Sequence, residues 1–162
     1  MNRRLFVLAA LVACLAPPLV AAPPSLTPAD IEKATGLRGI HLVPETTKGG
    51  VPGRRNYADG SGQIVLWFHD FSAEGYARAK AQPAQTFNGI VIEPKLFHAA
   101  VAGIGDEAFD SPDGKLQSAV YVRKGQAAFG LIANITTSAG GDKLTITMDQ
   151  LKALAKIVLS RM

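Results

Sequence analysis

The clearest hydrophobic pattern in this chain is an alternation over residues 116–123, which places Val120 on one face and Tyr121 on the other. Strict alternation of this kind predicts a strand of an antiparallel sheet with one buried face. Turn signals at Ser111–Gly114 and at Lys124–Gly125 flank this segment on either side. They predict a three-stranded meander, with strands at 105–109, 116–123 and 127–135.

A second group of strands is expected earlier in the chain. Ile64–Phe68 is apolar at every position, which predicts a central strand covered on both faces. Together with 56–59 it would form a hairpin around Asp59–Gly62. Short strands are also expected at 40–43 and within 87–93, and the glycine-rich stretch Lys48–Arg55 predicts a loop.

Capping signals predict three helices. Thr27 and Asp30 are spaced as a capping box, with Pro28 at the first helical position, and Gly36 would end that helix. The other two helices would begin after Ser72 and after Thr147, running over 73–82 and 148–160. The last one carries an apolar stripe typical of a helix docked on a sheet.

The order of these elements is α-β-β-β-α-(β)-β-β-β-α, which predicts an α+β fold. We expect an antiparallel sheet of about five to seven strands with two or three helices packed on one face. The unit of one helix and three strands occurs twice, over 27–69 and 72–135, and a duplication stays open because no repeat is visible at the residue level.

The first 22 residues have the three parts of a bacterial secretion signal. Arg3 and Arg4 precede an apolar run at 5–15, and small residues follow at Ala21 and Ala22. The run is too short to span a bilayer, which takes roughly 20 residues. Cleavage after Ala21 would release a soluble product, and residues 23–27 would be a leader before a single domain at 28–162.

A second processing route stays open. Leu11–Cys14 resembles a lipobox, in which case the signal would be residues 1–13 and Cys14 the lipidated residue. In either case the protein is expected in the periplasm or outside the cell, and it would contact a membrane only through a lipid on Cys14. The mature domain would then contain no cysteine for a disulfide.

Charge argues against a nucleic-acid partner. The chain has 17 Lys and Arg residues, and removing Arg3 and Arg4 leaves 15 against 13 acidic residues, a net charge of +2. Nucleic-acid proteins cluster their basic charge on one face, whereas these residues are scattered. The expected partner is an unknown envelope protein or a small ligand.

One segment resembles a known group of proteins. Val101-x-Gly-Ile-Gly-Asp-Glu-Ala-Phe109, followed by a turn and by Val120–Gly125, is similar to uncharacterised bacterial exported proteins and lipoproteins. That resemblance covers about residues 101–162 and implies an exported α+β domain without an assigned function. From the residues themselves, Gly103 and Gly105 predict a tight turn or bulge, and Asp106 is expected to bind nearby backbone N–H groups.

Three further motifs resemble ligand or metal sites, but each has a simpler structural interpretation. Gly103-x-Gly105-x-x-Ala matches a dinucleotide fingerprint, but the turn that follows excludes the required helix. Calcium would need the carboxylates of the 106–113 segment to converge, and zinc would need the three histidines to converge. Neither set has ligand spacing, so no metal or cofactor is predicted. The carboxylates are those of Asp106, Glu107, Asp110 and Asp113, and the three histidines are His41, His69 and His98.

Arg54 and Arg55 give the most plausible ligand contact, because two guanidinium groups after a glycine-rich loop can bind an anion. With no catalytic residues identified, we expect a non-enzymatic binding or interaction module of the cell envelope. Two alternatives stay open, namely a small periplasmic hydrolase or metal-dependent enzyme, and an inhibitor or immunity-type protein.

Overall fold

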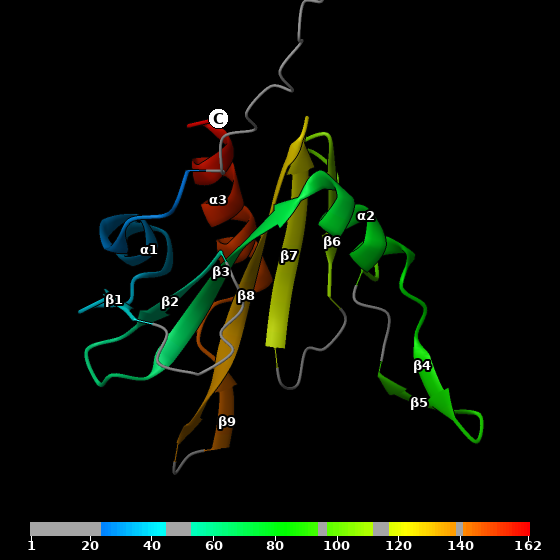
Figure 1. The fold of residues 1–162 in the computed structure, drawn as a ribbon. Coiled ribbons are helices and arrows are strands. Elements are labelled where there is room, and N and C mark those ends of the chain that lie inside the picture. The colour runs from blue at the N-terminus through cyan, green and yellow to red at the C-terminus, as the bar shows by residue number, and fades with distance from the viewer. Residues whose placement is uncertain (1–23, 45–52, 94–96, 112–116, 139–140) are drawn as a thin grey trace, which may run out of the picture.

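The computed structural model describes residues 24–44, 53–93, 97–111, 117–138 and 141–162. An antiparallel sheet runs in the order β1-β2-β3-β8-β7-β6, and β9 pairs with β8 (Figure 1). Its strands are β1 (His41–Val43), β2 (Arg54–Ala58), β3 (Ile64–Ser72), β6 (Glu107–Asp110), β7 (Gln117–Lys124), β8 (Ala127–Ser138) and β9 (Gly141–Leu144). The helices are α1 (Pro28–Thr35), α2 (Ala73–Ala81) and α3 (Met148–Leu159), and a separate hairpin contains β4 (Gln85–Phe87) and β5 (Ile90–Glu93). The predicted α+β fold is confirmed.

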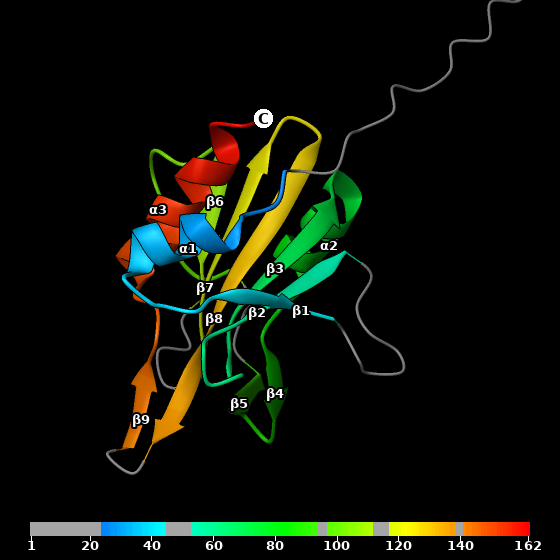
Figure 2. The same cartoon turned by 90° about the vertical axis from the view of Figure 1, so that its left-hand side faces the viewer.

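The main core lies between the sheet and helices α1 and α3. The two helices lie side by side on this face (Figure 2), and Gln150 Nε2 donates to the Thr35 carbonyl oxygen at 3.0 Å. Apolar side chains from β2, β3, β6, β7 and β8 pack there. The largest fully buried side chains of this core are Ile31, Tyr57, Leu66, Phe68, Phe129, Leu131, Ile146, Leu151 and Leu154.

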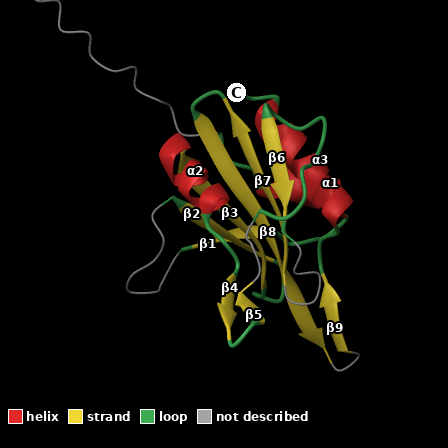
Figure 3. Ribbon diagram, turned by 90° about the vertical axis from the view of Figure 1, so that its right-hand side faces the viewer, coloured by secondary structure: helices red, strands yellow, loops and turns green. Residues whose placement is uncertain are grey.

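Helix α2 lies on the opposite face of the sheet, so the helices do not all share one side (Figure 3). Its Tyr76 ring lies 4.9 Å from the ring of Phe97, which in turn lies 4.7 Å from the ring of Tyr121 on β7. Tyr121 is therefore buried, although alternation predicted a half-buried strand. Tyr121 is covered by residues that are distant in the sequence, so alternation within the strand does not predict its burial.

Two meanders, β1-β2-β3 and β6-β7-β8, join through the pairing of β3 with β8. This register runs from Leu66 opposite Ala133 to Ser72 opposite Ala127. The strand order is therefore symmetric about the β3–β8 pair. The helices break this symmetry, because α1 and α2, which precede the two meanders, cover opposite faces.

The predicted helix boundaries are confirmed by their caps. Thr27 and Asp30 form a capping box, as do Thr147 and Gln150. Ser72 Oγ accepts a hydrogen bond from the Gly75 amide at 3.0 Å, and Gly36 ends α1 with φ +78°. These contacts span three or four residues, which is why sequence alone locates them.

The β4–β5 hairpin was not predicted as such. It turns at Asn88 and Gly89, whose φ angles are both positive (49° and 79°). Asn-Gly is a strong signal for a two-residue hairpin turn, and this dipeptide is the feature of the sequence that indicates the hairpin. The predicted turn Ser111–Gly114 falls mostly outside the described residues, as does most of the predicted loop Lys48–Arg55.

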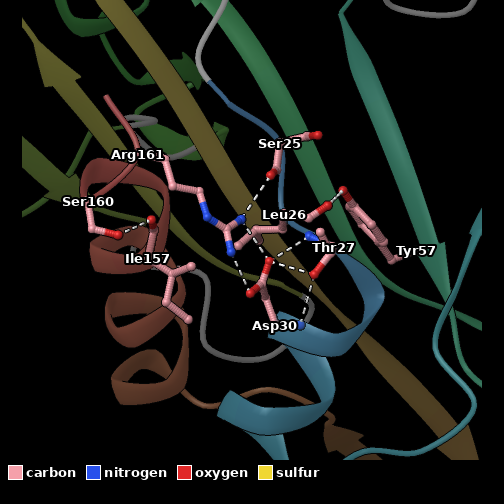
Figure 4. Close-up of polar contacts among 8 residues, drawn as sticks. All are labelled: Ser25, Leu26, Thr27, Asp30, Tyr57, Ile157, Ser160 and Arg161. Atoms are coloured by element: carbon pink, nitrogen blue, oxygen red, sulfur yellow. Dashed lines mark hydrogen bonds and ion pairs between the residues drawn. The ribbon is translucent and has the colours of Figure 1, made fainter.

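Polar contacts join the two ends of the described chain (Figure 4). The Arg161 guanidinium donates to both carboxylate oxygens of Asp30, at 2.7 and 2.8 Å, and to the Ser25 carbonyl oxygen at 3.3 Å. These bonds hold the pKa of the Asp30 carboxyl well below its usual range. The Tyr57 hydroxyl donates to the Leu26 carbonyl oxygen at 2.6 Å. Leu26 is itself part of the main core, so residues of the expected leader pack against the domain.

Candidate ligand-binding surface

Part of the sheet face that carries α2 has no described helix over it (Figure 1). Here Asn56 of β2 pairs with Trp67 of β3, which pairs with Ile132 of β8. Arg54 and His69 form the neighbouring cross-strand pair. Because paired residues of an antiparallel sheet point to the same face, these five side chains share one surface. We call it the Arg54–Trp67 surface.

A guanidinium and an indole lie against each other at the centre of this surface. The guanidinium carbon of Arg54 is 5.3 Å from the centroid of the Trp67 ring, a cation–π contact. Both side chains are partly exposed. The contact limits the orientations of the guanidinium, because stacking on the ring restricts a side chain that would otherwise move freely.

Asn56 is the buried polar residue of this surface. Its side chain is 5% exposed, and its Oδ1 atom has no hydrogen-bond partner among the described residues. An unsatisfied buried acceptor costs roughly 1–3 kcal/mol. Proteins keep few such groups, and those that they keep call for an explanation.

Aromatic rings connect this surface to the residues beneath α2. The His69 ring lies 4.2 Å from the ring of Phe71, which lies 5.9 Å from the ring of Tyr121. Gly130 leaves space for this row, since a Cβ there would come within 2.9 Å of the Tyr121 ring. The surface therefore borders a packed aromatic layer that fixes the position of β3.

Arg55 does not belong to this surface. It follows Arg54 in β2, and adjacent strand residues point to opposite faces. Its guanidinium lies 5.1 Å from the centroid of the Phe68 ring and 3.1 Å from Asp70 Oδ2. Burial raises the pKa of Asp70, while the nearby Arg55 charge opposes that shift. The two arginines, predicted to bind one anion together at the end of a loop, instead stand in a strand and do not converge.

The predicted glycine turn brings the start of β6 against the end of β7. Gly103 and Gly105 both have positive φ, +74° and +64°. The Asp106 amide donates to the Arg123 carbonyl oxygen at 2.9 Å, and Asp106 Oδ2 accepts from the Gly125 amide at 2.7 Å. The Asp106 side chain thus accepts from a backbone N–H group of the neighbouring turn, which is a structural role.

The carboxylates of the possible calcium site have separate partners. Glu107 contacts Lys80 and lies 3.6 Å from Arg123 Nε, and the hydrogen bond from Lys80 lowers the pKa of Glu107. Asp110 Oδ1 accepts from the Ala99 amide at 2.9 Å. Asp113 lies outside the described residues. Each described carboxylate therefore supports local structure.

The three histidines lie on different parts of the molecule. His41 is on the edge strand β1, where its Nδ1 is 3.0 Å from the Gly39 carbonyl oxygen. His69 belongs to the Arg54–Trp67 surface, and His98 lies 3.7 Å from Asp110. Within the described ranges, no group of three His, Cys, Asp or Glu side chains could hold a metal ion.

The predicted processing sites cannot be placed, because Cys14 and the rest of residues 1–23 lie outside the described chain. Among the residues that the structure does describe, no helix has the length and apolar character needed to cross a membrane.

Comparisons with known proteins give no further assignment. The chain matches no family model, and searches among curated proteins and among solved structures find no match. Sequence reasoning identified Arg54 but not Asn56 or Trp67. Their placement follows once β2 and β3 are aligned, because Asn56 then lies opposite Trp67.

Proposed function

We propose that this protein is an exported binding module of the bacterial cell envelope, which holds a ligand on the Arg54–Trp67 surface. The observation that carries this proposal is the partly exposed Trp67 stacked with Arg54 on a sheet face without a described helix over it. Exposed aromatic and arginine side chains are the types most enriched where proteins bind partners.

The export part of this proposal rests on the sequence. Residues 1–22 have the order of a secretion signal, with Cys14 as an alternative lipidation site, and the 101–109 motif resembles that of exported proteins. Mass spectrometry of the protein purified from the envelope fraction tests this directly. A chain that starts at residue 22, or at a lipidated Cys14, supports export, whereas an intact chain from Met1 in the cytosol contradicts it.

Photo-crosslinking in cells tests the binding surface. A benzophenone amino acid replaces Ile132 on the surface, and in a matched control it replaces Lys156, an exposed residue of α3 on the other side of the sheet. We expect a discrete adduct from position 132 that disappears in combination with Arg54→Gln. Equal labelling from both positions, or an adduct unaffected by Arg54→Gln, would contradict a specific surface.

A further inference from the structure

We infer that the Arg54–Trp67 surface binds a neutral saccharide, with the Trp67 ring against the C–H face of a pyranose and the Asn56 amide bonded to its hydroxyl groups. This inference rests on the proposed function and names the ligand class. It depends on three features of the surface, which are an unsatisfied acceptor, a row of apolar side chains and a position between interior strands.

The unsatisfied acceptor favours a ligand that donates a hydrogen bond. Asn56 is 5% exposed, and its Oδ1 atom has no hydrogen-bond partner among the described residues. Its cross-strand neighbours Val43 and Trp67 are both partly exposed, so a rotation of the indole would uncover the amide without opening the sheet. The stacking of Arg54 opposes this rotation only slightly, because a cation–π contact at a partly exposed site is weak. A ligand O–H that donates to Oδ1 then recovers part of the free energy lost by the buried oxygen.

Apolar side chains lie on both sides of this amide. Val43, Trp67 and Ile132 occupy the same cross-strand row as Asn56, and all three are partly exposed. Side chains of one row point to the same face of the sheet. A pyranose ring with equatorial hydroxyls has a flat C–H face that can cover an aromatic ring, while its hydroxyls lie at the rim, within reach of an amide beside that ring. Small-ligand sites typically combine apolar side chains with a few polar groups in this way.

The arginine of this surface does not call for an anionic ligand. Arg54 stacks on Trp67 and has a further interaction within the protein. Its guanidinium therefore serves to hold the indole, and a saccharide needs no contact with it. The Asn56 amide is neutral and can both donate and accept hydrogen bonds, which suits two adjacent hydroxyl groups.

The position within the sheet favours a saccharide over an extended peptide. Strands β2 and β3 are interior strands, each paired on both sides, so their backbone N–H and C=O groups are used within the sheet. Peptides that bind a sheet through their backbone add a strand at an edge. A peptide laid across this face would gain no such pairing, whereas the hydroxyls of a saccharide that do not contact the protein stay in water.

Trp67 gives a direct assay because it is the only tryptophan in the chain. The protein purified from the envelope fraction is titrated with cellotriose, maltotriose and triacetylchitotriose, and its fluorescence is followed. We expect a saturable change with at least one of these saccharides. The same saccharide with every hydroxyl methylated has no O–H donor and should bind at least roughly tenfold more weakly. Inorganic phosphate and N-acetyl-glycyl-glycyl-leucine are the comparison probes, and we expect no saturable change with either.

Asn56→Leu separates binding from folding. It should weaken saccharide binding roughly tenfold or more, measured by calorimetry, while its midpoint of urea unfolding stays equal or rises, because no unsatisfied oxygen remains. Lys156→Gln is the control, since this exposed residue of α3 lies on the other side of the sheet. It should leave binding within about twofold. The methylated saccharide makes the same test on the protein without any substitution.

Four results would overturn the inference. They are no saturable change with any of the three saccharides, equal binding of the methylated form, unchanged binding by Asn56→Leu, and a saturable change with the peptide or with phosphate. A lower urea midpoint for Asn56→Leu would also count against it, because Oδ1 would then have a partner in the folded protein. If the crosslink from position 132 persists while no saccharide binds, the ligand class is wrong and the proposed surface stands.

Discussion

Replacing Gly105 with alanine should be one of the most damaging small substitutions in this domain. The backbone at this position has φ +64°, where any side chain costs roughly 1–2 kcal/mol. A Cβ atom would also come within 2.6 Å of the Arg123 carbonyl oxygen and 2.9 Å of Val122 Cγ1. That carbonyl accepts the amide hydrogen bond of Asp106, so moving it disturbs the β6–β7 junction. Overpacking of this kind adds roughly 1–3 kcal/mol.

Gly103→Ala is the matched control. Gly103 has nearly the same backbone conformation, φ +74°, but a Cβ there would meet nothing within 4 Å. It should therefore show only the conformational cost of roughly 1–2 kcal/mol. We expect Gly105→Ala to reduce the free energy of unfolding by about 2–5 kcal/mol in total.

Urea unfolding followed by Trp67 fluorescence and circular dichroism measures both values. In thermal unfolding, each kcal/mol should lower Tm by about 4 °C for a domain of this size. The reasoning would be refuted if the two variants lost the same stability, because the close approach to Arg123 would then have no energetic effect.

Three other perturbations test single hydrogen bonds and ionisable groups. Tyr57→Phe removes the buried bond to the Leu26 carbonyl oxygen and should cost about 1–2 kcal/mol, whereas Tyr76→Phe removes a buried hydroxyl with no described partner and should cost clearly less. Equal urea midpoints would contradict this. Burial raises the pKa of both tyrosines from 10 to about 12, so their neutral forms stabilise the fold below pH 10 and that contribution should be lost between pH 10 and 12. In urea titrations, each Phe variant should lose less stability between pH 10 and 12 than the unchanged protein. Asp30 has a lowered pKa, so its contribution is present above about pH 4 and falls away at lower pH. Arg161→Gln should reduce the free energy of unfolding at pH 7 and weaken its dependence on pH in the acid range. If this variant loses as much stability at acid pH as the unchanged protein does, the Arg161–Asp30 pair does not lower the pKa of Asp30.

Local features of this fold could be predicted from the sequence. Helix α1 follows its cap Thr27 and α3 follows its cap Thr147, because each cap bonds a residue three positions later. The meander β6-β7-β8 is predicted by the alternation of apolar and polar residues and by the tight turn at Lys124–Gly125. The hairpin at Asn88 and Gly89 had an equally local signal that went unused.

The candidate site was only partly predictable. Arg54 and Arg55 were identified as a pair, but strand alternation sends them to opposite faces once β2 begins at Arg54. Arg55 is then engaged by Asp70, fifteen residues later. Asn56 carries no sequence signal, because its significance depends on burial and on the absence of a described partner for Oδ1.

The sequence by itself determined the features that depend on contacts within a few residues, namely the helix ends, the turns and the alternation of the strands. Only the tertiary structure decided the pairing of β3 with β8, which brings Leu66 to Ala133, and the side of the sheet that α2 covers. The physical reason is that an amphipathic strand specifies that one face is buried, but not which distant segment buries it. The part of one sheet face that no described helix covers, with Arg54 and Trp67 on it, is a consequence of where α2 packs.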